Sequence, residues 1–214
     1  MTRLQDNSLR GLYAITDASL KGTAIEQQVA LAIAGGARVI QYRDKSADQA
    51  LRLNEASAIM TVCRQLRVPL LINDDIDLAL RIGANGVHIG KDDGLLKDAR
   101  AQLGQNAIIG VSCYNQLSLA EQAEQNGASY VAFGRFFNSS TKPEAKQASL
   151  SLLEEARKKI ACPIVAIGGI TSDNGRPLIQ AGADMLAVIR GIFAADDVTA
   201  AARTIDSLFS ENTA

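Results

Sequence analysis

Short runs of consecutive apolar residues alternate along this chain with longer segments in which apolar positions recur at a helical spacing. The runs number eight, at Leu12–Ile15, Val39–Tyr42, Leu70–Ile72, Val87–Ile89, Ile108–Val111, Tyr130–Phe133, Ile164–Ile167 and Met185–Ile189. Most of them carry apolar residues at successive positions instead of alternate ones. This pattern is typical of strands that are buried on both faces, as in a parallel sheet.

The clearest helical segment spans Ala47–Leu66. Its apolar side chains share one face, at Ala56, Ile59, Met60, Cys63 and Leu66. Ser46 and Gln49 have the spacing of a capping box, in which two side chains satisfy backbone N–H groups at the start of a helix. The pattern therefore predicts a helix that begins beside Ser46 and buries this apolar face.

A Gly-Ala pair recurs just before every second run, in GGARVI, GANGVHI, GASYVAF and GADMLAV. The glycines Gly36, Gly83, Gly127 and Gly182 are separated by 47, 44 and 55 residues, so each period holds two strand–helix units. Glycine suits the turn that ends a helix before a strand. Four periods of two units give the eight units that close a (β/α)8 barrel.

An open, doubly wound sheet is the rival arrangement for alternating strands and helices. Its usual GxGxxG turn after the first strand is absent, because Thr16, Asp17 and Ala18 stand there. No linker rich in Ser and Gly divides the chain. We therefore predict an α/β fold, a single (β/α)8 TIM barrel over residues 1–214 with its core at about residues 11–209.

Composition and charge narrow the classes of partner. The chain is 47% hydrophobic and 21% charged with a net charge of −1, which argues against nucleic acid or an acidic membrane as a partner. No apolar run approaches the roughly 18 residues of a membrane span, and the N-terminal MTRLQDNSLR has no apolar signal core. Cys63, Cys113 and Cys162 are far apart and odd in number, as expected of reduced thiols in a cytoplasmic protein.

The unusual polar residues gather at the ends of the predicted strands, where barrel enzymes carry their catalytic groups. They are Gln41, Arg43 and Lys45 at the end of the second run, Asn73 and Asp74 after the third, Asp92 and Asp93 after the fourth, Ser112 after the fifth, Gly168 and Gly169 after the seventh, and Ile189 and Arg190 at the eighth. Carboxylates bind Mg²⁺, which usually bridges to substrate phosphates. Lysine, arginine and exposed glycine backbone bind phosphate directly. The set predicts a phosphate site with a metal.

Simpler interpretations exist for several acidic residues and for the histidine. Asp74, Asp75 and Asp77 could cap a short helix, because Asp is a preferred cap. With Asp93 predicted on the same rim, a functional role is favoured for Asp74, whereas Asp75 and Asp77 are interpreted as structural. His88 lies inside an apolar run without an evident acid–base partner, so a hydrogen-bonded core or lining histidine is favoured over a catalytic one.

Six motifs occur in order on successive predicted strand ends: YAITD, QYRDK, NDDIDLAL, GVHIGKDD, STK and AIGGI. Together they resemble the motif series of the thiamine phosphate synthase family, from about Gly11 to Phe193. The resemblance implies an enzyme of thiamine biosynthesis with two phosphorylated small-molecule substrates. It would join 4-amino-5-hydroxymethyl-2-methylpyrimidine diphosphate to hydroxyethylthiazole phosphate, giving thiamine phosphate and pyrophosphate. It also implies a dissociative path through a pyrimidine methyl cation.

The resemblance assigns roles residue by residue. The positions that match contacts to the pyrimidine diphosphate are Gln41, Arg43, Lys45, Asn73, Ser112 and Lys142, of which Arg43, Lys45, Ser112 and Lys142 are the expected catalytic set. Asp74 and Asp93 match the ligands of one Mg²⁺ ion. The positions that match contacts to the thiazole phosphate are Ser139, Thr141, Gly169, Ile189 and Arg190. The family commonly has Thr at the position of Ser139 and Ser at that of Arg190.

Two alternatives remain at this point. One is a barrel relative that tautomerises the thiazole phosphate or acts in regulation, and the other is a phosphate-binding module without catalysis. The first would not need paired Mg²⁺ acids and diphosphate cations, so the synthase is favoured by Asp74, Asp93, Arg43, Lys45 and Lys142. The second would bind thiamine phosphate yet release no pyrophosphate. The patterns carry no prediction about the oligomeric state.

Overall fold

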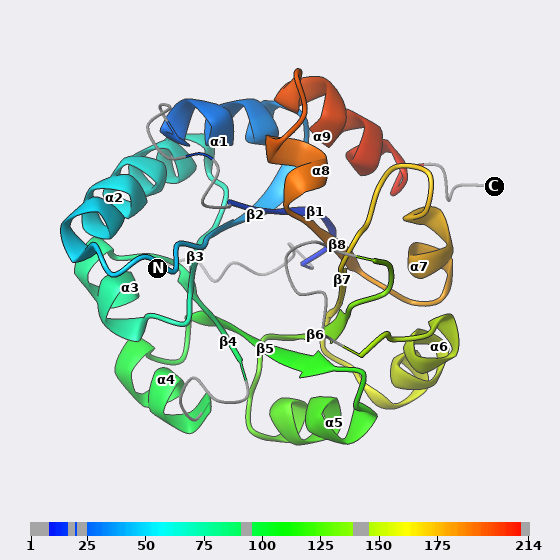
Figure 1. The fold of residues 1–214 in the computed structure, drawn as a ribbon. Helices are drawn as coiled ribbons and strands as arrows, with labels where there is room; N and C mark the ends of the chain where they lie inside the picture. The colour runs from blue at the N-terminus through cyan, green and yellow to red at the C-terminus, as the bar shows by residue number, and fades with distance from the viewer. Residues whose placement is uncertain (1–8, 17–19, 21–24, 91–95, 139–145, 211–214) are drawn as a thin grey trace.

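Eight parallel strands close into one barrel (Figure 1). The computed structural model describes residues 9–16, 20, 25–90, 96–138 and 146–210. The strands are β1 (Gly11–Ile15), β2 (Ala37–Tyr42), β3 (Leu70–Asn73), β4 (Gly86–Ile89), β5 (Ile108–Tyr114), β6 (Tyr130–Gly134), β7 (Ile164–Ile167) and β8 (Met185–Val188). Each strand pairs with its sequence neighbours, and β8 pairs with β1 to complete the circle.

Helices surround the barrel as an outer ring (Figure 1). They are α1 (Ile25–Ala34), α2 (Gln49–Leu66), α3 (Ile76–Ile82), α4 (Leu96–Leu103), α5 (Leu117–Gln125), α6 (Leu150–Lys159), α7 (Arg176–Gln180), α8 (Arg190–Phe193) and α9 (Val198–Ser207). The prediction of a single (β/α)8 barrel is confirmed, and each apolar run became a strand.

Strand residues divide between two apolar clusters because successive side chains point to opposite faces of a strand. The inner cluster fills the barrel and contains Tyr13, Ile15, Val39, Leu71, Tyr130, Ala132, Val165, Met185 and Ala187. The outer cluster joins the alternate strand positions to the helices. Burial on both faces explains why the strands have continuous apolar runs. It also means that the inward positions at the ends of strands face a common space.

The start and one face of α2 differ from the prediction. The helix begins at Gln49 after the N-cap Asp48, whose side chain accepts a hydrogen bond from the backbone N–H of Leu51. The predicted capping box is wrong because the Ser46 hydroxyl donates instead to Asp44, at 2.6 Å. The prediction that Leu66 belongs to the buried face is also wrong, because its side chain is 47% exposed.

Four glycines occupy the predicted turns before alternate strands. Gly36, Gly83, Gly127 and Gly182 all have positive φ, between 64° and 112°, which other residues rarely adopt. The repeat read from the sequence therefore corresponds to a repeated backbone turn.

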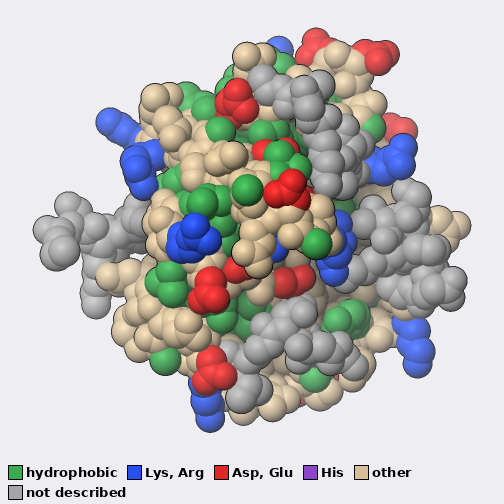
Figure 2. Space-filling model, turned by 60° about the vertical axis from the view of Figure 1, so that its left-hand side comes forward, with side chains coloured by type: hydrophobic (Ala, Val, Ile, Leu, Met, Phe, Trp, Pro, Cys, Tyr) green, Lys and Arg blue, Asp and Glu red, His purple; other side chains and the backbone are tan. Residues whose placement is uncertain are grey.

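The charged side chains on the surface, the character of the helices and the state of the cysteines are those of an ordinary globular protein. Figure 2 shows acidic and basic side chains interspersed on the face that it presents. Among the described helices, none has both the length and the apolar character needed to cross a membrane. Cys63 and Cys113 are buried free thiols, and Cys162 is a partly buried one.

Candidate active site at the mouth of the barrel

A cavity of about 420 Å³ opens at the C-terminal ends of the strands. Among the residues that line it are the predicted site residues Gln41, Arg43, Lys45, Asn73, Asp74, Ser112, Gly169, Ile189 and Arg190. The remaining predicted residues, Asp93, Ser139, Thr141 and Lys142, lie outside the described residues. The prediction that the polar strand ends share one rim is confirmed for every member that the structure describes.

Strand alternation explains how the inward-facing members reach the cavity. Gln41 lies two residues after Val39 of the inner cluster, and Asn73 lies two residues after Leu71. Side chains two apart on a strand share a face, so the polar residue follows the apolar one into the barrel interior. Each strand therefore changes from a core-filling side chain to a cavity-lining one at its C-terminal end.

Buried Thr16 holds the end of β2 in place beside the cavity. Its backbone N–H donates to the carbonyl oxygen of Gln41 at 2.9 Å. Its hydroxyl accepts a hydrogen bond from the backbone N–H of Arg43 at 3.0 Å. Thr16 is 0% exposed, and these contacts fix the backbone from which the Arg43 and Lys45 side chains extend.

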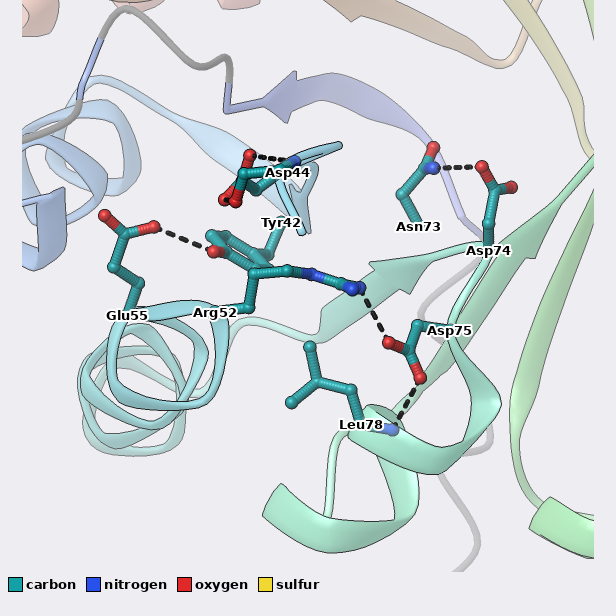
Figure 3. Close-up of polar contacts among 9 residues, drawn as sticks. Tyr42, Asp44, Arg52, Glu55, Asn73, Asp74, Asp75 and Leu78 are labelled. Carbon is teal, nitrogen blue, oxygen red and sulfur yellow. Dashed lines mark hydrogen bonds and ion pairs between the residues drawn. The ribbon is translucent and has the colours of Figure 1, made fainter. Parts of the chain in front are cut away.

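Asp74 is held in an unusual backbone conformation at the cavity wall. Its φ is 64°, in the left-handed region where non-glycine residues are uncommon. Its carboxylate accepts a hydrogen bond from the amide of Asn73 (Figure 3). One oxygen of that carboxylate lies 4.0 Å from the Lys45 ammonium. The Asp74 backbone N–H donates to the carbonyl oxygen of His88 at 2.9 Å. The turn thus brings one carboxylate and one amide to the wall where the Lys45 cation also lies.

The next residue, Asp75, has a structural role. Its carboxylate caps α3 by accepting from the backbone N–H of Leu78 at 2.8 Å, and it pairs with the Arg52 guanidinium at 2.6 Å (Figure 3). Asp77 lies in the first turn of α3 and is exposed. The structural interpretation of Asp75 is confirmed.

The described part of the predicted metal site is the Asp74 carboxylate. Carboxylate oxygen is a preferred ligand of Mg²⁺, and the neighbouring Asn73 side chain also carries an oxygen. Within the described residues there is no group of three His, Cys, Asp or Glu side chains that could hold a metal. A cation bound here would therefore draw on water, on a substrate or on parts of the chain outside that description.

Two consecutive glycines form the opposite wall. Gly168 and Gly169 have φ of 109° and 65°, and both line the cavity. A Cβ at Gly169 would lie 2.4 Å from the carbonyl oxygen of Asn138, so a larger residue would collide with the segment after β6. Such a glycine pair exposes backbone that can approach an anion closely.

Five polar side chains, three of them buried and two partly buried, are linked by direct hydrogen bonds beneath the cavity. Gln41 Nε2 donates to the Tyr13 hydroxyl at 2.6 Å, which lies 2.8 Å from the Tyr130 hydroxyl. That hydroxyl is 2.9 Å from His88 Nδ1, and His88 Nε2 is 2.9 Å from the Ser112 hydroxyl. The interpretation of His88 as a hydrogen-bonded lining histidine is confirmed.

Several residues that line the cavity or join the hydrogen bonds beneath it were not predicted from the sequence. Tyr13 and Tyr130 were treated as members of apolar runs, although a tyrosine in an inward position needs a hydrogen-bond partner when buried. Arg135 and Asn138 also line the cavity, and the guanidinium donates to the Asn138 side-chain oxygen at 2.9 Å. Their place directly after β6 was the available signal.

Known proteins are similar to this chain over nearly its whole length. Residues 12–192 match the family model described as thiamine monophosphate synthase. A thiamine-phosphate synthase from Nitrosococcus oceani is 55% identical over 197 residues, which cover 92% of this chain and 91% of that protein. The solved thiamine phosphate pyrophosphorylase from Pyrococcus furiosus has a TM-score of 0.87 and 32% identity, over 97% of this chain and 98% of that one.

A thiamine phosphate pyrophosphorylase structure from Bacteroides thetaiotaomicron has a TM-score of 0.71 over 95% of this chain and all of its own. At 14% identity it supports the likeness of the fold alone. The family-model match and the two closer similarities extend across the strands that carry the cavity residues. On these grounds the chain belongs to the thiamine monophosphate synthase family.

Proposed function

We propose that this chain is a thiamine phosphate synthase, a transferase that couples 4-amino-5-hydroxymethyl-2-methylpyrimidine diphosphate to hydroxyethylthiazole phosphate with release of pyrophosphate. The observation that carries the proposal is the convergence of Arg43, Lys45 and Asp74 on one cavity wall, across from Gly168 and Gly169. One wall suits a diphosphate with a divalent cation, and the other suits a second phosphate group. Two phosphorylated substrates in one cavity are what the reaction requires.

The cations would bind and stabilise the leaving group. Negative charge builds on pyrophosphate as its bond to the pyrimidine methylene carbon breaks, and fixed cations lower the barrier most when they are already in place. Arg43 is anchored through its backbone to Thr16, and Lys45 lies beside Asp74. The thiazole nitrogen attacks with its own lone pair, so the site needs no strong general base.

Mg²⁺ is the proposed cofactor, one ion held by Asp74 together with Asp93. When bound, it would supply a Lewis acid that neutralises charge on the departing diphosphate. Asn73 would orient the Asp74 carboxylate through their hydrogen bond. Because two carboxylates fill only part of an octahedral shell, we expect weak Mg²⁺ binding until the diphosphate arrives.

The thiazole phosphate would lie against the glycine wall. Gly169 would offer backbone N–H, and Ile189 and Arg190 line the same part of the cavity. Ser139 and Thr141 for this phosphate, and Lys142 for the pyrimidine diphosphate, are proposed from the family motif alone. Arg190 is exposed, and its guanidinium would pair with the phosphate from the solvent side.

The alternative functions fit the cavity less well. A thiazole phosphate tautomerase or a regulatory relative has no use for the Arg43–Lys45 pair beside a carboxylate. A binding module without catalysis would not need Asp74 in a left-handed conformation, which costs roughly 1–3 kcal/mol and is retained at functional sites. Both features favour turnover of a diphosphate.

The decisive experiment measures pyrophosphate and thiamine phosphate together. We expect both products only when both substrates and Mg²⁺ are present, and loss of both in excess EDTA with recovery on adding Mg²⁺. Unchanged activity in EDTA would exclude the metal role. Binding of thiamine phosphate without pyrophosphate release would identify a binding module instead.

A further inference from the structure

Five linked polar side chains cross the barrel, and we call them the buried polar chain. Gln41, Tyr13 and Tyr130 are buried, and His88 and Ser112 at its other end are partly buried. They come from five different strands, β2, β1, β6, β4 and β5. Every link is a direct hydrogen bond of 2.6 to 2.9 Å. Both ends of the buried polar chain, Gln41 and Ser112, line the cavity. A network of this kind ties the two sides of the cavity floor together.

The barrel interior is shaped around the two tyrosines. A Cβ at Gly110 would lie 1.9 Å from Cζ of the Tyr130 ring, so only glycine leaves room for that ring. Tyr13 and Tyr130 meet edge to face with ring centroids 5.9 Å apart, and the His88 ring stacks on Tyr130 at 5.7 Å. Neither tyrosine side chain is free to move its hydroxyl away.

Hydrogen-bond donation runs through the buried polar chain in one direction. Gln41 Nε2 can only donate, so the Tyr13 oxygen accepts and its own proton must go to the one other partner that the structure describes, Tyr130. Tyr130 in turn donates to Nδ1 of His88. Burial raises the pKa of both phenols well above the ordinary value, so both keep the proton that this order requires.

The direction fixes the histidine and then the serine. An imidazole that accepts at Nδ1 carries its proton on Nε2 when neutral, and that N–H donates to the Ser112 oxygen at 2.9 Å. The Ser112 hydroxyl proton then has no role within the buried polar chain and is available to a molecule in the cavity. The reverse order would need the Gln41 amide turned over, with its oxygen facing Tyr13.

We propose that the buried polar chain holds His88 in the Nε2–H tautomer and so makes Ser112 a hydrogen-bond donor to the ring of the pyrimidine substrate. Tyr13, Tyr130 and His88 are positioning residues in this account. The identity of the ring rests on the proposed function. At the other end, Gln41 commits its amide nitrogen to Tyr13 and presents its oxygen as an acceptor.

The two ends therefore specify the chemistry of the ring that lies between them. The ring must offer an acceptor to Ser112 and a donor to Gln41. An aminopyrimidine has both, since its ring nitrogens accept and its exocyclic amine donates. A pyrimidinone exchanges the two positions, with a ring N–H donor where the aminopyrimidine has an accepting nitrogen and a carbonyl acceptor where it has the amine. A site built to hydrogen-bond one pattern rejects the other by leaving its own buried groups unpaired.

The wild-type protein alone tests the tautomer. The chain contains a single histidine, so ¹⁵N-histidine labelling gives one set of ring signals that needs no assignment by mutation. We expect a protonated Nε2 and a bare Nδ1 in the protein without substrate. A proton on Nδ1, or on both nitrogens, at neutral pH would overturn the proposal.

Tyr130→Phe tests the link to substrate. It removes the donor to Nδ1, so we expect mixed tautomers and a KM for the pyrimidine diphosphate raised by about tenfold, the scale of one hydrogen bond. The KM for the thiazole phosphate should stay the same, and discrimination against the pyrimidinone diphosphate should fall. An unchanged tautomer, or equal effects on both substrates, would contradict a positioning role.

Tyr42→Phe is the matched control. Tyr42 is 1% exposed and donates to Glu55 at 2.7 Å outside the barrel, so the change also removes a buried tyrosine hydrogen bond. We expect the tautomer and both KM values to match the wild type. The wrong tautomer in a fully active enzyme would overturn this inference alone. The expected tautomer without thiamine phosphate formation would overturn the proposed function and the substrate part of the inference.

Discussion

Asp74 and Asp75 are adjacent carboxylates that the backbone sends in different directions. Asp74 adopts a φ of 64° and lines the cavity, whereas Asp75 turns to cap α3 and pair with Arg52. The left-handed residue between the strand and the helix produces this separation. A difference of one position therefore decides between a role in the cavity and a role in stability.

Replacing Asp74 with Asn should remove the charge and keep the shape. Asn tolerates the left-handed conformation, so we expect little change in the melting temperature. Turnover should fall by at least about 10²-fold, the scale of losing one preorganised electrostatic element. Steady-state kinetics at saturating Mg²⁺ would measure this fall in the turnover rate. Asp77→Asn is the control, because it removes an equal charge from an exposed position of α3, and it should leave turnover unaltered.

At the scale of elements, α3 depends on a cap that is also an ion pair. Arg52 on α2 has a side chain only 19% exposed, and its Nε is buried without a hydrogen-bond partner among the described residues. Among the described residues, Asp75 is thus the hydrogen-bond and charge partner of this guanidinium, which it contacts at a terminal nitrogen. The contact holds α3 to α2 and supports the turn that carries Asn73 and Asp74.

Asp75→Ala should destabilise the protein more than Asp48→Ala, although both remove an N-cap oxygen. Loss of a cap costs roughly 1 kcal/mol. Asp75→Ala should cost about 1–3 kcal/mol more, because a half-buried charged group loses its partner. Urea denaturation measures both. Equal losses of stability in the two variants would mean that the ion pair adds nothing. Asp75→Asn keeps the cap oxygen, so its loss of stability should lie between those of Asp48→Ala and Asp75→Ala.

The apolar runs predicted the strands because parallel barrel strands are buried on both faces, and they end where polar cavity residues begin. The start of α2 was not predicted correctly because Asp48 and Ser46 are both good N-cap residues. Asp48 is the N-cap in the structure, since the Ser46 hydroxyl is engaged by Asp44. The buried polar chain escaped because its hydroxyls, Tyr13 and Tyr130, are 117 residues apart in the sequence. Only the closed barrel brings them together.

For the molecule as a whole, two buried thiols couple stability to alkaline pH. Burial raises the pKa of Cys63 and Cys113 to about 12. The folded state therefore holds these protons more tightly than the unfolded chain, whose thiols titrate near pH 8.5. The stability gained by keeping both thiols protonated is complete below about pH 8.5 and is lost as the pH rises toward 12.

The free energy of unfolding should consequently fall between pH 8 and pH 10.5, by roughly 1 kcal/mol per pH unit for each thiol above its unfolded pKa. Chemical denaturation across this range would measure the slope. In the Cys63→Ala, Cys113→Ala double variant the slope should be shallower, whatever its absolute stability. Parallel slopes in the two proteins would show that the thiols do not contribute.

The pairing of β8 with β1 has a consequence for the order of events during synthesis. Strand β1 is made before the other seven strands, whereas its second neighbour, Met185–Val188, is made after them. Until then Tyr13 can meet Tyr130 only across an open seam, and the unpaired edge of β1 is exposed to other growing chains. Until β8 has been made the sheet is incomplete, so the barrel and the cavity at its mouth can close only after that strand pairs with β1.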